Sequence, residues 1–129
     1  MTIHNLGSKT DLLSLHNTAV VSATGAGTPA YVDLLNYEGD VAFMIDAAAG
    51  GAGITRTAKL QHSATTTSGD FADITGGGFT AAAANTAFSE KIYLNSNDLL
   101  RYVRVLFTVS GGSGTGSVSV TALASKKYV

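Results

Sequence analysis

The chain contains no cysteine, no tryptophan, a single proline and few charged residues. Without cysteine it has no disulfides, no thiolate metal sites and no cysteine nucleophile. Charged residues make up 13% of the sequence, against roughly 25% in ordinary soluble domains. The net charge of -1 provides no basic field for nucleic acid, and no apolar run approaches the ~20 residues that cross a bilayer. We therefore expect no nucleic acid and no membrane among its partners.

Small neutral residues take the place of the missing charges. Alanine, glycine, serine and threonine together make up nearly half of the 129 residues. Two interpretations are open. The surface simply tolerates small side chains, or much of it faces other protein, where charges would be costly to desolvate.

Short segments of β character alternate with Gly-rich and Ser/Thr-rich breaks along the chain. The clearest alternation is at 102–109, where we predict that Val105 and Phe107 face the core. This segment and the one that follows the glycine-rich link 111–116 predict a long hairpin with a flexible tip. Eight strands are predicted in all, at 17–24, 31–35, 41–45, 55–62, 71–74, 87–94, 102–109 and 118–124.

These eight segments, with no long helical segment among them, predict an all-β fold, a jelly-roll-like antiparallel β-sandwich. The continuous apolar run 41–45 predicts a strand buried on both faces, and 96–100 predicts one helical turn. The length fits one domain. We assign residues 16–129 to the sandwich and residues 1–15 to an N-terminal arm, because the apolar residues of the arm follow no strict alternation.

The arm carries five large apolar side chains that are costly to leave in water. We predict that they contact another subunit. The alternative is that they cover one open end of the sandwich. The predicted interface residues are Ile3, Leu6, Leu12, Leu13 and Leu15.

No catalytic or metal-binding motif stands out in the sequence. His4, His16 and His62 share no metal-ligand spacing, and His62 is expected to bond the backbone at a turn. The serine in Gly112-Ser113-Gly114 has no helix behind it, as a nucleophile elbow would require. The acidic residues within 33–40 are too sparse for a calcium loop and predict a solvated turn. We therefore expect no enzyme, no metal and no cofactor.

A succession of short motifs resembles small structural proteins of tailed bacteriophages. It begins with Tyr37-Glu38-Gly39-Asp40-Val41-Ala42-Phe43 and Lys59-Leu60-Gln61-His62-Ser63. It continues through Asp70-Phe71-Ala72-Asp73-Ile74 and Arg101-Tyr102-Val103-Arg104-Val105, and it closes on Lys126-Lys127-Tyr128. Among these proteins the sequence is most similar to capsid cement, or decoration, proteins with a jelly-roll fold. The resemblance covers roughly residues 15 to 128.

The resemblance implies a non-enzymatic virion protein that binds the outside of an assembled capsid and bridges neighbouring capsomers. Its expected partners are the major capsid protein and copies of itself, as a dimer or trimer. Its expected location is the capsid surface, after synthesis in the host cytoplasm. The alternative is a carbohydrate- or receptor-binding module of a phage tail or head–tail appendage, because sandwich folds host both functions. The absence of tryptophan counts against sugar binding.

Overall fold

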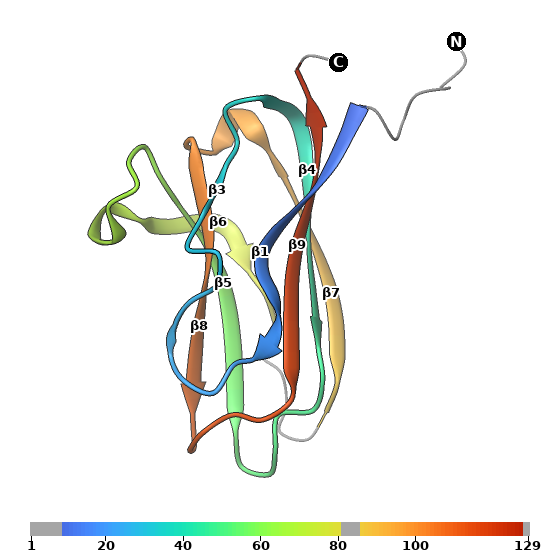
Figure 1. Cartoon of the computed structure of the whole chain (residues 1–129), viewed down its shortest axis with the longest axis vertical. Helices are drawn as coiled ribbons and strands as arrows, with labels where there is room; N and C mark the ends of the chain where they lie inside the picture. Colours follow the sequence, from blue (N-terminus) through green and yellow to red (C-terminus); the bar gives the residue numbers. More distant parts are fainter. Residues whose placement is uncertain (1–8, 81–85, 128–129) are drawn as a thin grey trace.

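A computed structural model describes residues 9–80 and 86–127 of the chain. Two antiparallel sheets face each other, and these residues form no α-helical element (Figure 1). The predicted all-β sandwich is therefore confirmed. The elements are β1 (Thr10–Val20), β2 (Gly25–Ala26), β3 (Val32–Asp33), β4 (Tyr37–Ala47), β5 (Thr55–Ser63), η1 (Ser68–Asp70), β6 (Ala72–Gly78), β7 (Phe88–Asn95), η2 (Ser96–Asp98), β8 (Tyr102–Ser110) and β9 (Ser117–Lys126).

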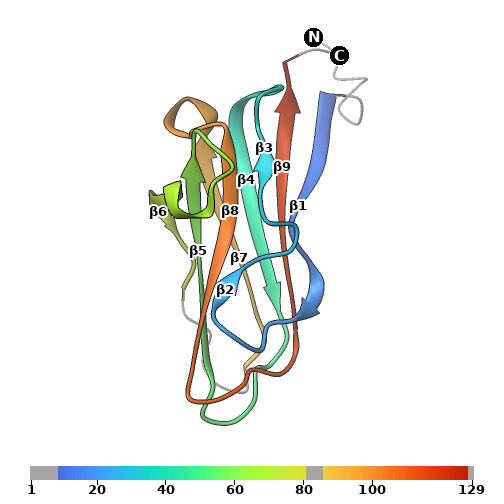
Figure 2. The same cartoon turned by 60° about the vertical axis from the view of Figure 1, so that its left-hand side comes forward.

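The strand order is that of a jelly roll. One sheet, which we call the front sheet, has the order β1-β9-β4-β7. The other, the back sheet, has the order β2-β8-β5-β6, and β3 also pairs with β8 (Figure 2). Because β2 and β3 are two short segments along the same neighbour, the sandwich has eight strand positions. This matches the double-sheet jelly roll, which is built from eight strands.

The core lies between the sheets and is filled by alternate residues of each strand. In β4, Val41, Phe43 and Ile45 are buried, while Ala42 and Met44 on the opposite face are half-buried. The prediction that this strand is buried on both faces is therefore wrong. No second layer covers the outer face of the front sheet within the described residues.

Strand β8 has the predicted register. Val105 is completely buried and Phe107 is 3% exposed, so both face the core. The ring of His16, from β1, packs edge-on against Phe107 with their centroids 4.9 Å apart. The predicted helical turn at 96–100 is also confirmed as η2, where the Asn95 side chain accepts a 2.9 Å hydrogen bond from a backbone N–H.

The described part of the expected N-terminal arm is a strand. β1 begins at Thr10 and pairs with β9, so the expected boundary between residues 15 and 16 falls inside β1 and is corrected. The predicted strand at 17–24 overlaps only the last part of β1, and the first part was missed because the register shifts between Ser14 and His16 and again between His16 and Ala19. Such bulges break the period of two by which a strand is found in a sequence.

The predicted hairpin of the last two strands is wrong, because β8 and β9 lie in different sheets. The link 111–116 crosses from the back sheet to the front sheet and packs against the connection between β4 and β5. The N–H of Thr115 donates to the carbonyl of Gly50 at 3.0 Å. A side chain at Gly111, where φ is positive, would collide with the backbone of Gly53. The glycines of this link therefore permit a close crossing.

Candidate interaction surfaces

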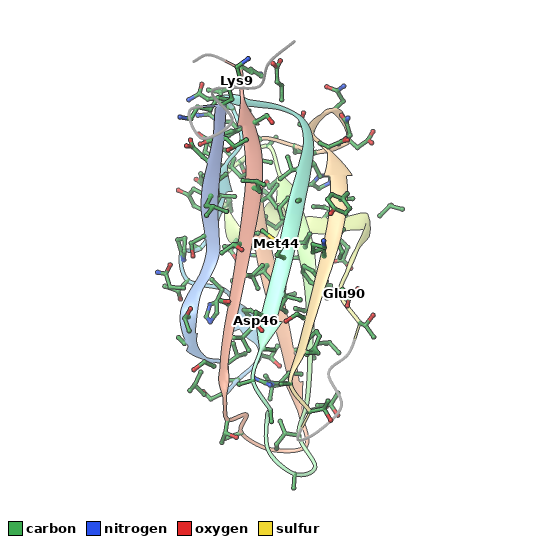
Figure 3. All side chains as sticks on the ribbon, turned by 90° about the vertical axis from the view of Figure 1, so that its right-hand side faces the viewer. Lys9, Met44, Asp46 and Glu90 are labelled. Atoms are coloured by element: carbon green, nitrogen blue, oxygen red, sulfur yellow. The ribbon has the colours of Figure 1, made fainter. Side chains whose placement is uncertain are left out.

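The outer face of the front sheet, which faces the viewer in Figure 3, carries an apolar row that crosses all four strands. In register across the sheet, Leu12 on β1 lies beside Leu123 on β9, then Ala42 on β4 and Tyr93 on β7. We call these four residues the apolar stripe. Leu12 is 70% exposed, Tyr93 64% and Leu123 39%. The outer face of a one-sided antiparallel sheet is normally polar, so this row is unusual.

Two successive rows follow the stripe on the side toward Ala47, and both are mostly neutral. In register they consist of Ser14, Thr121, Met44 and Lys91, and then of Ser119, Asp46 and Ser89. Lys91 and Asp46 are the only charged residues in these three rows, and both line a groove together with Met44. Figure 3 labels Met44 and Asp46 on β4. The Ser89 hydroxyl donates to Asp46 at 3.0 Å. Exposed aromatic and aliphatic side chains with little charge are typical of the centre of a protein interface.

A second surface lies at the end of the sandwich where β4 and β8 begin. It is a groove between the β3–β4 and β7–β8 connections, lined by Leu35 and Leu100, which are 50% and 46% exposed. We call it the end groove. Arg101 in its wall forms a bidentate pair with Asp33, with Nη2–Oδ2 at 2.8 Å and Nε–Oδ1 at 3.0 Å. This pair joins the two walls and lowers the pKa of Asp33.

Part of the outer face of the back sheet is covered by the chain itself. The β5–β6 connection, residues 64–71, contributes Ser68 and Phe71 to a layer over Arg104, which is 9% exposed. Arg104 donates from Nη1 to the Ser68 hydroxyl at 2.9 Å and lies 4.4 Å from the centre of the Phe71 ring. It also donates from Nε to the Gln61 side chain at 2.9 Å. We call this set of contacts the Arg104 network.

Asp73 on β6 extends this network to the surface. It accepts hydrogen bonds from the Gln61 amide at 2.8 Å and from the Lys59 ammonium at 2.9 Å. These contacts, the Gln61 bond first, lower the pKa of Asp73. Gln61, Phe71, Asp73 and Arg104 all belong to the motifs that carry the sequence resemblance. Three of those motifs therefore meet in one place, where they hold a loop on a sheet.

The five residues predicted to form a subunit interface do not share one surface in the structure. Leu15 is completely buried in the core and Leu13 packs against that core, so both are covered by this chain. A side chain without exposed surface has none to offer a partner, which corrects the prediction for Leu15. Leu12 points outward and belongs to the apolar stripe. Ile3 and Leu6 lie outside the described residues.

The two histidines within the described residues, His16 and His62, accept backbone hydrogen bonds. His62 Nδ1 accepts from the N–H of Leu100 at 3.2 Å, which agrees with its predicted role. His16 Nδ1 accepts from the N–H of Thr28 at 3.1 Å, while its Nε2 is buried without a partner. Burial lowers the pKa of His16. Across residues 9–80 and 86–127, no three histidine or carboxylate side chains are grouped closely enough to hold a metal ion.

Nor do the described residues include a helix with the length and hydropathy of a membrane span.

The fold is shared with proteins of viral origin. No family model and no curated protein matches the sequence. Among solved structures, the SPBc2 prophage-derived protein YomS aligns with 89% of this chain and 91% of its own, at 10% identity and a TM-score of 0.50. A chain of infectious bursal disease virus, Gx strain, aligns with 93% of this chain at 10% identity and a TM-score of 0.51. This chain covers 33% of that virus chain. At these identities the likenesses show a common fold.

Proposed function

We propose that this chain is a non-enzymatic structural protein of a phage virion, which binds the outside of the capsid and bridges neighbouring capsomers. The observation that carries the proposal is the presence of two separate surfaces with exposed apolar side chains, the apolar stripe and the end groove with Leu35 and Leu100. A bridging protein must hold two neighbours at once, so it needs two contact surfaces or one surface repeated by symmetry. The decoration-protein motifs and the likeness to a prophage-derived fold support the same function.

We assign the contact with the major capsid protein to the end groove. Its two leucines stand on connections that are fixed to each other by the ion pair between Arg101 and Asp33. Because Arg101 and Asp33 already pair with each other, covering them leaves neither charge alone away from water. The other two charged residues that line the groove, Glu38 and Lys127, are of opposite sign. Leu35 and Leu100 then supply the apolar area that is buried against the shell.

Cryo-electron microscopy of particles purified from cells that carry the gene tests this proposal. We expect density for the chain on the outer capsid surface, with the end groove against the shell. Changing Leu35→Ser and Leu100→Ser together is expected to weaken binding to the particles at least tenfold. Val20→Ser is the matched control, because Val20 is 54% exposed at the last position of β1 and does not line the end groove. Density on the tail or the head–tail junction would contradict the proposal.

A second candidate function, carbohydrate or receptor binding on a tail appendage, has one feature in its favour. Tyr31 and Tyr102 pack edge-on with their centroids 5.2 Å apart, and the Arg101 guanidinium lies 4.9 Å from the centre of the Tyr102 ring. Tyr31 is 37% exposed. An edge-on pair does not present the flat double platform that stacks on a sugar, so we prefer the capsid function. A glycan array that gives specific binding, lost in Tyr31→Ala, would reverse this preference.

A further inference from the structure

We infer that two copies of this chain pack face to face through the apolar stripe, about a two-fold axis that runs parallel to the strands between β9 and β4. This inference deepens the proposed function by naming the self-contact. It rests on that function only for the direction of the axis.

The stripe is complementary to its own rotated copy. A rotation about this axis exchanges β1 with β7 and β9 with β4. The four stripe residues lie at one level along the strands, so the rotation keeps them level. Leu12 then packs on Tyr93 of the second copy, and Leu123 packs on its Ala42. Each contact occurs twice, as an isologous interface requires, and every apolar residue of the stripe covers another one.

The charges of the face also fit this arrangement. Lys91 on β7 comes to lie opposite Ser14 of the second copy, because these residues share one row. Asp46 on β4 comes to lie opposite Ser119, whose hydroxyl can donate to the carboxylate. Neither charge meets its like, and each faces a small polar side chain. Like-charge contacts, which penalise a wrong partner, are absent from these three rows.

The face is large enough for a specific dimer. At ~4.8 Å between strands and ~3.4 Å per residue, a four-stranded face with its side chains measures roughly 20 by 30 Å. Two such faces bury roughly 1,200 Å² in total, which is the lower end of the range for stable specific interfaces. The 11 residues of β4 span the length of this face.

The direction of the axis connects the pair to a shell. An axis parallel to the strands leaves the end grooves of both copies at the same end of the pair. Such a pair presents two grooves to one surface and can therefore hold two capsomers. An axis across the strands would point the two grooves in opposite directions, where only one could reach the shell. Bridging therefore selects the parallel axis.

Cysteine cross-linking tests this pairing cleanly, because the chain has no cysteine of its own. The full chain is made as Leu12→Cys and as Tyr93→Cys, separately and co-expressed. After mild oxidation we expect a disulfide-linked dimer with one chain of each variant, and none from either variant alone. Thr108→Cys co-expressed with Leu12→Cys is the control and should stay unlinked, because Thr108 is exposed on β8 in the back sheet.

Sedimentation of the unmodified chain gives the second measurement. We expect a dimer, and we expect Leu123→Lys, with an unchanged circular dichroism spectrum, to raise its dissociation constant at least tenfold. Cross-links in each variant alone, but none between them, would overturn the axis. An unmodified chain that is monomeric at concentrations on the order of 100 μM would overturn the pairing. The pairing would also be overturned by a chain that is monomeric and whose stripe becomes accessible to solvent only after residues 1–8 are deleted.

These outcomes are separate from the fate of the proposed function. A monomer that still binds particles through the end groove would refute the pairing and leave the capsid contact standing. A cross-linked dimer that binds no particle would refute the capsid contact and leave the pairing standing.

Discussion

The two sheets differ in what lies on their outer faces. The back sheet is covered in part by its own chain, because the 64–71 connection lies over Arg104, which is 9% exposed. The front sheet has no such cover among the described residues, and its stripe residue Leu12 is 70% exposed. One face therefore buries polar groups and the other exposes apolar ones. A layer from the same chain covers the Arg104 network on the back sheet, and the pairing proposed above gives the front sheet a layer from a second copy.

The core that both sheets share should give the largest effect. Phe107→Ala is expected to lower the free energy of unfolding by about 3–5 kcal/mol, because a fully packed aromatic ring is replaced by a cavity. Urea denaturation followed by circular dichroism measures the loss. A loss below about 1 kcal/mol would show that Phe107 does not fill the space between the sheets.

Removing the cover of the back sheet should give the next largest effect. Arg104→Met keeps the length of the side chain but deletes its bonds to Gln61 and Ser68. We expect a loss of about 2 kcal/mol in unfolding free energy, since hydrogen bonds to charged groups are worth roughly 1.5–3 kcal/mol. Limited proteolysis should then cut within 64–71 faster than in the parent chain.

Lys59→Met is the matched control for Arg104→Met. It removes the exposed ion pair with Asp73 from the edge of the same network. Exposed pairs contribute little, so the stability and the rate of cleavage should stay close to those of the parent chain. Equal losses in the two variants would mean that burial of Arg104 is not what holds the loop.

A smaller effect on stability is expected when pH changes the charge of His16, which lies on the edge strand β1 of the front sheet. Because burial lowers the pKa of His16 in the folded chain, the unfolded chain binds a proton more readily. The contribution that buried, neutral His16 makes to stability is complete above the unfolded pKa of 6.5, and it is lost as the pH falls below that value. His16→Gln should reduce the slope of stability against pH just below 6.5, in urea titrations at several pH values. An unchanged slope would exclude His16 as its source.

The smallest effect on stability is expected from the apolar stripe. Leu12→Ser and Tyr93→Ser together should change the unfolding free energy of the monomer by no more than about 1 kcal/mol, because each side chain already lies in water. The measurement is made at a concentration low enough to keep the parent chain monomeric. A loss as large as that of Phe107→Ala would mean that the stripe packs within one chain, and the contrast between the two faces would disappear.

The sequence predicted where the strands lie in the chain better than it predicted which strands pair in the sheets. Alternation at 102–109 and 118–124 placed Val105 and Phe107 correctly, because the period of two reports which face a residue occupies. It does not report which strand lies alongside. The link 111–116 therefore resembled a hairpin tip, although it crosses between sheets. In the same way the first part of β1, up to Leu15, was taken for an arm, because the bulges of this strand hide the alternation.

The candidate surfaces were predictable only in part. Leu12 was among the residues predicted for an interface, since an exposed leucine is costly in water. Leu123, Ala42 and Tyr93 looked like ordinary outer residues of separate strands, and only the registers of three strand pairs align them. Burial of Arg104 was not predictable either, because it depends on where a loop folds.

The position of β9 between β1 and β4 has a consequence for synthesis on the ribosome. The first strand of the chain and β4 both pair with β9, and neither pairs with the other. Until β9 emerges, the nascent chain therefore presents two unpaired strand edges, which are prone to join with other chains. The front sheet cannot form until β1 pairs with β9, which requires contacts between residues far apart in the sequence, such as Thr10 with Ser125. Contacts so distant in sequence make folding slow, so we expect demand for a holding chaperone during translation.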